Sequence, residues 1–280
     1  MIPIRIEDGA DARLSAYAGV RDPRGLRDRG LLIAEGRFVI GRLLASGRLK
    51  VESLLLNDAA LRGLRDEIAH ADPSLHVYVA SADVIAAATG FDMHRGYLAV
   101  ADRPAPLVLD AVLPASSLVV VLEQVVDTDN VGAVFRNAEA FGVDLILLSP
   151  GSGDPFYRKA IRTSSGATMV VPFVAPAPWP DALDRLRAAG FVIVAMTPSA
   201  DAVEIGEFIA TKASHGRVAV LLGTEGHGLT TAAIERADIC VRIPMSGTLD
   251  SLNIATAAGI TLHRLHDVRR GPFPRAISRG

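Results

Sequence analysis

Three short segments place polar side chains and glycines directly after apolar runs, where they could bind a ligand or take part in catalysis. The first is DTDNVGAVFRNAEAFG, residues 127–142, which follows LVVVLE. We expect a helix here, with Asp129 or Asn130 as its N-cap. Its apolar face comprises Val131, Val134, Phe135, Ala138 and Phe141. Arg136 lies off this face and could bind a phosphate, although spacing alone favours an amphipathic helix with a solvated arginine.

The second segment, GTEGHG at residues 223–228, follows the apolar run VAVLL. Its three glycines would let the backbone approach a ligand closely at the carboxyl end of a strand, where parallel sheets bind ligands. The spacing differs from the dinucleotide-binding fingerprint, and the lysine of a phosphate-binding loop is missing. A carboxylate at Glu225 would repel phosphate. The segment therefore predicts a cationic or zwitterionic ligand, with a plain tight turn as the alternative.

The third segment, IPMSGTLDSLN at residues 243–253, opens the last expected helix. Ser251 is the candidate N-cap, and Asn253 presents an amide in the first turn. The small residues that follow, ATAAG at 255–259, would let another backbone pack closely, within this chain or in a second copy. Taken alone, the pattern predicts only a capped helix.

The composition predicts a folded α/β protein that positions these segments. Of the 280 residues, 50% are apolar, which excludes a largely disordered chain. Nine Phe, four Tyr and one Trp fit strands buried under helices better than an aromatic RNA-binding sheet. The single cysteine, Cys240, excludes an internal disulfide and a multi-cysteine zinc site, and we expect no metal.

Short apolar runs alternate with helical patterns along the chain. Before residue 104 the expected strands are 31–34, 51–56, HVYVAS and GYLAVA, with helices through 38–44 and 83–89. Later, strands of a parallel sheet covered on both faces are expected at the continuous apolar runs SLVVVLE, VDLILLS, FVIVAM and RVAVLLG. The helices expected among and after them are 131–141, 155–165, 181–189 and 252–265.

A proline-rich stretch, DRPAPLVLDAVLPASS at residues 102–117, separates two regions that differ in how strongly apolar runs alternate with helical patterns. We therefore predict a first domain at 1–104, a linker at 105–116, a second domain at 117–270 and a basic tail at 271–280.

Charge is unevenly distributed although the net charge is only −2. Arg21–Lys50 carries eight basic residues against three acidic ones, and the end of the chain is rich in arginine. Both stretches could bind nucleic-acid phosphates, although a charge run is usually a solvated surface. No apolar run has the ~18 residues of a membrane helix, and we expect a cytoplasmic protein.

Together and in this order, NVGAVFRNAEAFG, LLGTEGHGL and IPMSGTLDSLNIATAAG closely resemble the motifs of the SpoU family of RNA ribose 2'-O-methyltransferases, in the SPOUT superfamily. The resemblance covers residues 117–267. More weakly, residues 27–58 with MHRGYLAV are similar to the small, ribosomal-protein-like substrate-recognition domain that often precedes it. The resemblance implies an α/β fold with a parallel sheet, a carboxyl-terminal trefoil knot that binds S-adenosylmethionine, and a homodimer with the active site at its interface.

The resemblance also implies roles for individual residues. S-adenosylmethionine would contact Thr197, Gly223, Ile243, Met245 and Leu252. The catalytic set would be Asn130, Arg136, Glu225, Ser251 and Asn253. The family usually has Asp-Pro where this chain has Asp127 followed by Thr128, so the loop before Asn130 departs from the family pattern.

The resulting hypothesis is an S-adenosylmethionine-dependent RNA 2'-O-methyltransferase. It would act on ribosomal RNA rather than transfer RNA, because a separate amino-terminal recognition domain is present. The alternatives are a transfer RNA methyltransferase and a non-catalytic RNA-binding protein of the same fold, and the intact catalytic set favours an enzyme. An oxidoreductase is disfavoured, since the dinucleotide-binding fingerprint is absent.

Overall fold

The computed structural model describes residues 2–20, 22–91, 96–224, 226–247 and 250–270. The chain divides into two compact units, Met1–Ala105 with Asp154–Val170, and Pro106–Gly153 with Val171–Gly280. The first break falls in the proline-rich stretch. Asp154–Val170 belongs to the first unit although the chain on both sides of it belongs to the second. The domain limits expected from the sequence stay a prediction.

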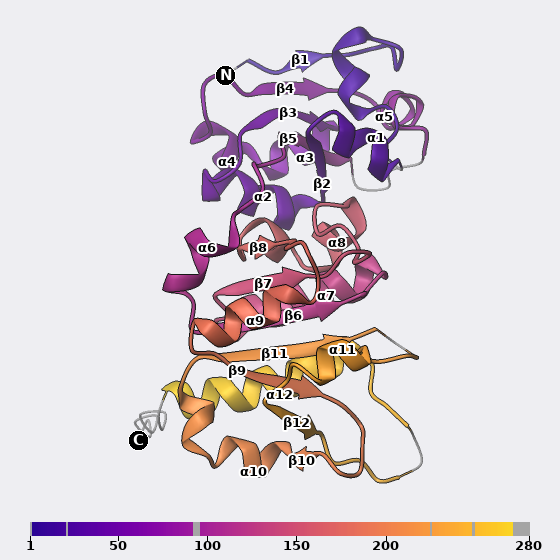
Figure 1. Cartoon of the computed structure of the whole chain (residues 1–280). Coiled ribbons are helices and arrows are strands. Elements are labelled where there is room, and N and C mark those ends of the chain that lie inside the picture. Colours follow the sequence, from indigo (N-terminus) through magenta and orange to yellow (C-terminus); the bar gives the residue numbers. More distant parts are fainter. Residues whose placement is uncertain (1, 21, 92–95, 225, 248–249, 271–280) are drawn as a thin grey trace. The chain divides into compact units, whose positions relative to one another are not determined.

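A five-stranded mixed sheet forms the centre of the first unit (Figure 1). Its strands are β1 (Ile4–Arg5), β2 (Leu31–Glu35), β3 (Val51–Leu56), β4 (His76–Val79) and β5 (Tyr97–Asp102). Their order is β1-β4-β3-β5-β2, with β1, β4 and β3 parallel and β5 antiparallel to both neighbours. Strands β2 to β5 confirm the four strands expected from the apolar runs.

Six short α-helices belong to the described part of the first unit: α1 (Pro23–Asp28), α2 (Arg37–Ser46), α3 (Asp58–Gly63), α4 (Arg65–Ala69), α5 (Ala82–Thr89) and α8 (Arg158–Thr163). Helix α2 follows β2 through Gly36, whose φ of 96° favours glycine, and it buries Val39, Ile40 and Leu43. The periodicity of 38–44 predicted this helix, and α5 confirms the helix expected at 83–89.

The second unit contains a seven-stranded sheet whose described pairings are all parallel. Its strands are β6 (Leu118–Glu123), β7 (Leu145–Leu148), β8 (Phe173–Val174), β9 (Val192–Met196), β10 (Val203–Glu204), β11 (Val218–Gly223) and β12 (Ile239–Arg242). The order is β10-β12-β9-β11-β6-β7-β8. The predicted α/β fold with a parallel sheet is confirmed, since both faces are covered and the strands β6, β7 and β11 are almost entirely buried.

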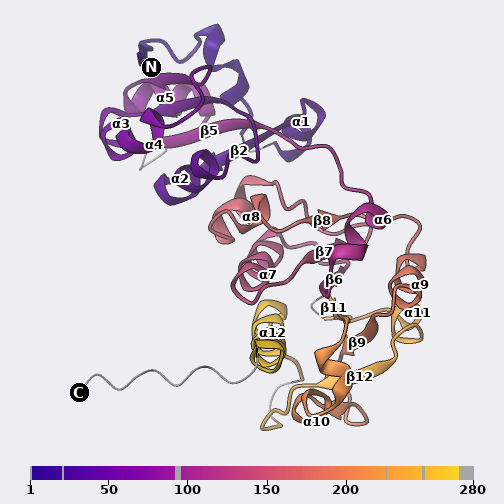
Figure 2. The same ribbon diagram turned by 90° about the vertical axis from the view of Figure 1, so that its left-hand side faces the viewer.

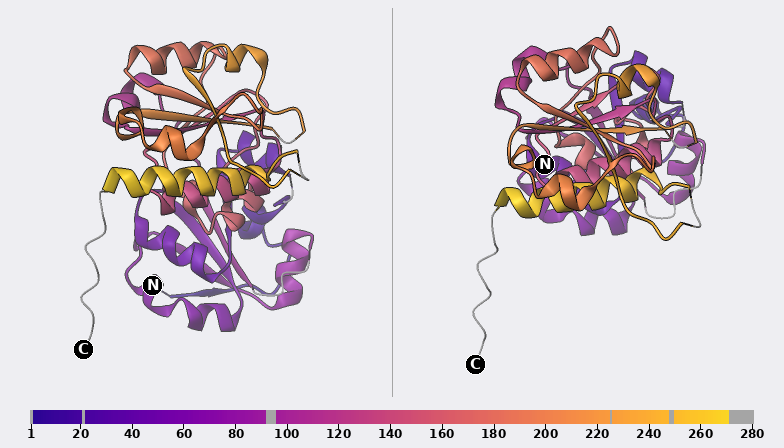
Figure 3. Two further views of the ribbon diagram at one scale, coloured as in Figure 1. Left: turned by 90° about the horizontal axis from the view of Figure 1, so that it is seen from below. Right: turned by 60° about the horizontal axis from the view of Figure 1, so that its bottom comes forward.

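Helices cover both faces of this sheet. The helices are α6 (Leu109–Val112), α7 (Thr128–Ala140), α9 (Asp181–Ala188), α10 (Ile205–Ile209), α11 (Thr231–Ile234) and α12 (Ile254–Arg270). Figures 2 and 3 show α7 and α12 on one face and α9 and α11 on the other. Leu109 and Leu113 lie in the core with α9, so the expected linker packs onto the second unit. The trefoil knot stays a prediction.

Two expected helix caps are wrong. Helix α7 is capped by Asp127, which accepts a hydrogen bond from Asp129 N at 2.8 Å, rather than by Asp129 or Asn130. Helix α12 begins at Ile254, and Asn253 rather than Ser251 caps it, accepting from Ala255 N at 2.9 Å. Several polar residues precede each helix and all could cap it, so the sequence did not distinguish among them. The apolar face of α7 is confirmed by fully buried Val131, Val134, Phe135 and Ala138.

Candidate functional site

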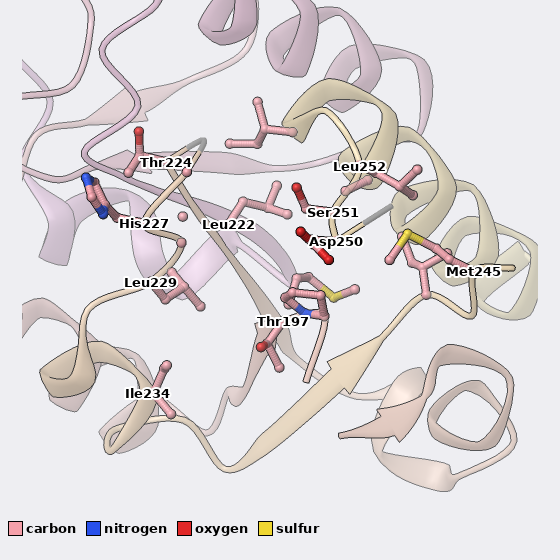
Figure 4. A pocket seen from close by; sticks show the side chains of 18 residues that line it. Thr197, Leu222, Thr224, His227, Leu229, Ile234, Met245, Asp250, Ser251 and Leu252 are labelled. Atoms are coloured by element: carbon pink, nitrogen blue, oxygen red, sulfur yellow. The ribbon is translucent and has the colours of Figure 1, made fainter. Parts of the chain in front are cut away.

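A cavity of about 400 Å³ lies at the carboxyl ends of β9, β11 and β12 in the second unit. Figure 4 shows Ser251 and Asp250 between Leu222 and Leu252, with His227 at one end of the cavity and Met245 at the other. The edge formed by the carboxyl ends of parallel strands is the usual ligand-binding edge of such sheets. The cavity is therefore the candidate site of this unit.

The loop after β11 folds back over Gly223. Thr224 and Gly228 form an isolated antiparallel bridge, and Gly228 N donates to Thr224 O at 3.0 Å. A Cβ atom on Gly223 would lie 2.2 Å from Gly228 C and 2.3 Å from Leu229 N. These contacts are with backbone atoms, so a side chain at this position requires the loop to move. Gly223 therefore fixes the wall of the cavity.

A buried carboxylate holds the far end of the same loop. Glu123 ends β6, pairs in register with Gly223, and is 1% exposed. Its Oε2 accepts from Thr230 N, and its Oε1 accepts from Thr230 Oγ1 and Trp179 Nε1, each at 2.8 Å. Thr230 in turn caps α11, whose Ile234 lines the cavity. Glu123 thus connects β6 to the cavity wall without lining it.

The start of α12 is positioned against α7. Asn253 Nδ2 donates to Asn130 Oδ1 at 3.0 Å, while the Asn253 side chain also caps α12. About two turns further along α7, Asn137 Nδ2 donates to Ala255 O at 2.8 Å. Gly259 leaves room for this packing, because a Cβ there would lie 3.3 Å from Asn137 Nδ2. Ala255 and Gly259 of the ATAAG segment therefore pack against α7 of the same chain.

All five residues expected to contact a cofactor line the same cavity: Thr197, Gly223, Ile243, Met245 and Leu252. They come from the ends of β9, β11 and β12 and from the turn before α12. Motifs that are far apart in the sequence therefore meet at one place. Their role as cofactor contacts stays a prediction.

The expected catalytic residues are brought together only in part. Ser251 lines the cavity, and Asn253 and Asn130 are hydrogen-bonded beside it. Arg136 is exposed on α7 and is not among the cavity residues, and its side chain has no hydrogen bond or ion pair with any residue that the structure describes. Glu225 lies outside the described residues.

Several residues of the site were missed by sequence reasoning. Met196, Pro198, His227, Asp250, Ile254 and Ala257 also line the cavity. Most of them are direct neighbours of predicted residues, so the sequence already held the signal. Glu123 is different, because a glutamate at the end of an apolar run looks like a solvated strand end. Its burial depends on Trp179 and Thr230, which no local pattern connects to it.

The cavity favours an apolar ligand that carries positive charge. Its described lining is mostly apolar, contains no lysine or arginine, and includes the carboxylate of Asp250. An anionic phosphate would find no cationic partner in this lining. Among the described residues, no group of three or more His, Cys, Asp or Glu side chains could hold a metal ion.

The sequence profile of the SpoU rRNA methylase family matches residues 117–263, which include every described part of this cavity. The chain belongs to the SpoU rRNA methylase family. Among its relatives is an uncharacterised tRNA/rRNA methyltransferase of Mycobacterium tuberculosis, 44% identical over 91% of this chain and 89% of the relative. The 23S rRNA (guanosine(2553)-2'-O)-methyltransferase RlmP of Bacillus subtilis is 24% identical over 93% of this chain and 98% of its own length.

A solved structure supports the same SpoU fold. The AdoMet-bound rRNA methyltransferase of Sinorhizobium meliloti superposes with a TM-score of 0.77 at 23% identity, covering 94% of this chain and 97% of that one. The matched part extends well beyond residues 117–263, so the similarity in fold includes the first unit. No helix in the described part of this SpoU protein is both long and apolar enough to cross a membrane.

Proposed function

We propose that this protein transfers a methyl group from S-adenosylmethionine to a ribose 2'-hydroxyl of RNA. The observation that carries the proposal is one cavity, at the ends of three parallel strands in a SpoU protein, that is lined by all five residues expected to contact the cofactor. The named activity of RlmP and the AdoMet bound to the S. meliloti enzyme support it. An RNA ribose methyltransferase needs such a cavity for the methyl donor.

The chemistry of the cavity fits S-adenosylmethionine. Its apolar side chains, among them Leu222, Ile243 and Leu252, would hold the adenine ring, and Asp250 would stabilise positive charge on the amino acid part. Backbone groups around Gly223 would complete the contacts. When bound, this cofactor supplies an electrophilic methyl group on a sulfonium, which suits a cavity whose described lining contains no lysine or arginine.

The reaction forms a bond between the ribose oxygen and the methyl carbon while the carbon–sulfur bond breaks. The hydroxyl proton leaves to a phosphate of the substrate or to water, because a guanidinium group is not a base in proteins. We assign Arg136 to the phosphate beside the target ribose, where its two-pronged donor geometry aligns the oxygen and stabilises developing negative charge. Glu225 either orients this arginine or accepts the proton.

Asn130, Asn253 and Ser251 would shape the entrance for the ribose. The Asn253–Asn130 hydrogen bond joins the two helices at this point, and Ser251 lies at the cavity itself. Their amide and hydroxyl groups can hydrogen-bond sugar hydroxyls without adding charge.

A homodimer would supply an arginine side chain to the site, which the described lining of the cavity lacks. Arg136 is exposed and not among the residues that line the cavity, and the apolar side chains of Val126 and Ile260 are exposed near α7 and on α12. An interface on these helices would cover the apolar side chains and bring Arg136 of one copy to the RNA bound by the other. A monomeric mass at micromolar concentration would contradict this arrangement.

We favour ribosomal RNA as the substrate, with transfer RNA as the alternative, because a separate first unit is present and RlmP is named for 23S rRNA. We expect the protein to meet such a substrate in the cytoplasm. Calorimetry with S-adenosylmethionine distinguishes an enzyme from a non-catalytic RNA-binding protein, which need not bind the cofactor. Mapping ribose methylation on RNA from cells with and without the protein would identify the substrate, and identical maps would contradict the proposal.

A further inference from the structure

A second, larger cavity lies in the first unit, which the site described so far does not use. Its volume is about 1100 Å³, and its lining comes from the β2–α2 corner, α4, β5 and α8. Figures 1 and 2 show α2 and α8 close together. The lining includes four arginines, Arg37, Arg42, Arg158 and Arg162, against two glutamates. We call this cavity the arginine groove.

Three of these arginines are anchored by contacts within the first unit. Arg158 forms an ion pair with Glu35, and its guanidinium lies 4.9 Å from the centre of the Phe91 ring. Arg42 donates to Ser165 O at 2.9 Å. Arg37 Nε donates to Gly63 O at 2.8 Å. Because their geometry is fixed in advance, these arginines lose little side-chain freedom when an anion binds.

The fourth arginine is available to a ligand. Arg162 is exposed, and its side chain has no hydrogen bond or ion pair with any described residue. Both glutamates are paired, Glu35 with Arg158 and Glu67 with Arg37 at 3.9 Å between Oε1 and Nη2. The described lining thus holds two more arginines than carboxylates. The groove therefore keeps a positive charge that is not balanced within its described lining, which favours a polyanion.

An aromatic ring is presented to solvent in the same groove. Phe38 lies in the first turn of α2 and is 67% exposed, with the Arg42 guanidinium 5.9 Å from its ring centre. An exposed phenylalanine beside arginines gives a nucleic-acid base a surface for stacking and gives the adjoining phosphates a cation. Gly36 precedes this turn without a side-chain cap, so the first N–H groups of α2 are open to an acceptor.

We infer that the arginine groove binds an unpaired segment of the substrate RNA, with one base stacked on Phe38 and phosphates on Arg37 and Arg162. The volume is slightly above the roughly 300–1,000 Å³ of small-molecule pockets, so the groove has room for more than one nucleotide. Two of its arginines come from the basic stretch Arg21–Lys50, and two come from Asp154–Val170. The inference rests on the proposed function for the presence of an RNA substrate, but it concerns a different unit.

The test measures binding of the full chain to a fluorescent single-stranded RNA of 12 nucleotides and to the same RNA as a duplex. Phe38→Ala should weaken single-strand binding by about 5-fold to 150-fold, the range for loss of one stacked base, and should leave duplex binding unchanged. Arg162→Gln should lower the slope of log affinity against log salt by about 0.7, the value for one phosphate on a single strand.

Arg24→Gln is the matched control, because Arg24 is exposed in the same basic stretch but lies on α1 outside the groove. It should bind like the wild type. Equal binding by Phe38→Ala, Arg162→Gln and the wild type would overturn the inference, as would an equal loss in Arg24→Gln. If only Arg162→Gln weakens RNA binding, and it weakens binding of inorganic polyphosphate equally, the groove is a general anion site. This result would overturn the base-stacking assignment.

Failure of the groove and failure of the proposed function give different results. If the wild type methylates ribosomal RNA transcripts and the variants do so with unchanged KM for RNA, the groove inference is wrong and the proposed function stands. If the wild type binds RNA through Phe38 but transfers no methyl group, the groove stands and the proposed function is wrong. If the wild type neither binds nor methylates RNA, both are wrong.

Discussion

Replacing Glu123 with glutamine should loosen the wall of the proposed cofactor cavity although Glu123 does not line that cavity. The carboxylate accepts three hydrogen bonds, two from Thr230 and one from Trp179. A glutamine has one acceptor oxygen, so its NH₂ group must face an N–H or O–H that was previously bound. At least one buried hydrogen bond is therefore lost, and a donor is left facing a donor.

The expected size of the effect follows from these contacts. A hydrogen bond to a charged group contributes about 1.5–3 kcal/mol, and a buried group left unpaired costs a similar amount. We therefore expect Glu123→Gln to lower the free energy of unfolding by about 2 kcal/mol, or roughly 4–8 °C in Tm for a domain of this size. S-adenosylmethionine should bind more weakly as well, because Thr230 ends the loop that begins at Gly223.

Thermal unfolding followed by circular dichroism and calorimetry with S-adenosylmethionine would measure both effects. Glu235→Gln is the matched control, since Glu235 is exposed next to α11, and it should change neither value. Trp179→Phe removes one donor to the carboxylate and should give a smaller effect that does not add to that of Glu123→Gln. A Glu123→Gln protein with wild-type Tm and cofactor affinity would refute the reasoning.

Three further predictions concern other parts of the molecule. Gly223→Ala should weaken S-adenosylmethionine binding at least about tenfold in calorimetry, because its Cβ would lie 2.2 Å from Gly228 C; an unchanged Kd would show that the loop adapts. Arg136→Lys should lower kcat about 10²-fold while cofactor affinity stays unchanged, because lysine keeps the positive charge but lacks the paired N–H donors of the guanidinium; wild-type kcat would contradict bidentate positioning. Burial raises the pKa of Tyr17 above its usual range, so the first unit should lose stability as pH rises through about 10, where the unfolded tyrosine ionises. Urea unfolding at pH 8 and pH 10.5 should show this loss in the wild type and a smaller one in Tyr17→Phe, and equal losses would contradict it.

Much of the second unit could be predicted from the sequence because its signals are local. The continuous apolar runs of β6, β7, β9 and β11 mark strands buried on both faces, and the spacing of Val131, Val134, Phe135 and Ala138 marks the inner face of α7. The cavity residues followed from motif resemblance, since each motif stands at the end of a strand. Parallel strands end at one edge, and this geometry brings the motifs together.

The features that the sequence did not predict depend on distant contacts. Asp154–Val170 belongs to the first unit because Arg103 pairs with Asp154 and Arg158 pairs with Glu35, and residues so far apart leave no periodic pattern. The burial of Glu123 depends in the same way on Trp179. The helix caps were missed for another reason, since Asp127 competes with two neighbouring residues that cap equally well.

The most direct test of the account is to locate the methyl group that the purified protein transfers. The protein is incubated with S-adenosylmethionine labelled in its methyl group and with unmodified ribosomal RNA transcripts, and the RNA is then hydrolysed in alkali. A methyl group on a ribose 2'-oxygen blocks cleavage at that nucleotide, so the account predicts that the label remains in alkali-resistant dinucleotides. Label recovered on single nucleotides with a methylated base, or no transfer to any RNA despite cofactor binding, would contradict it.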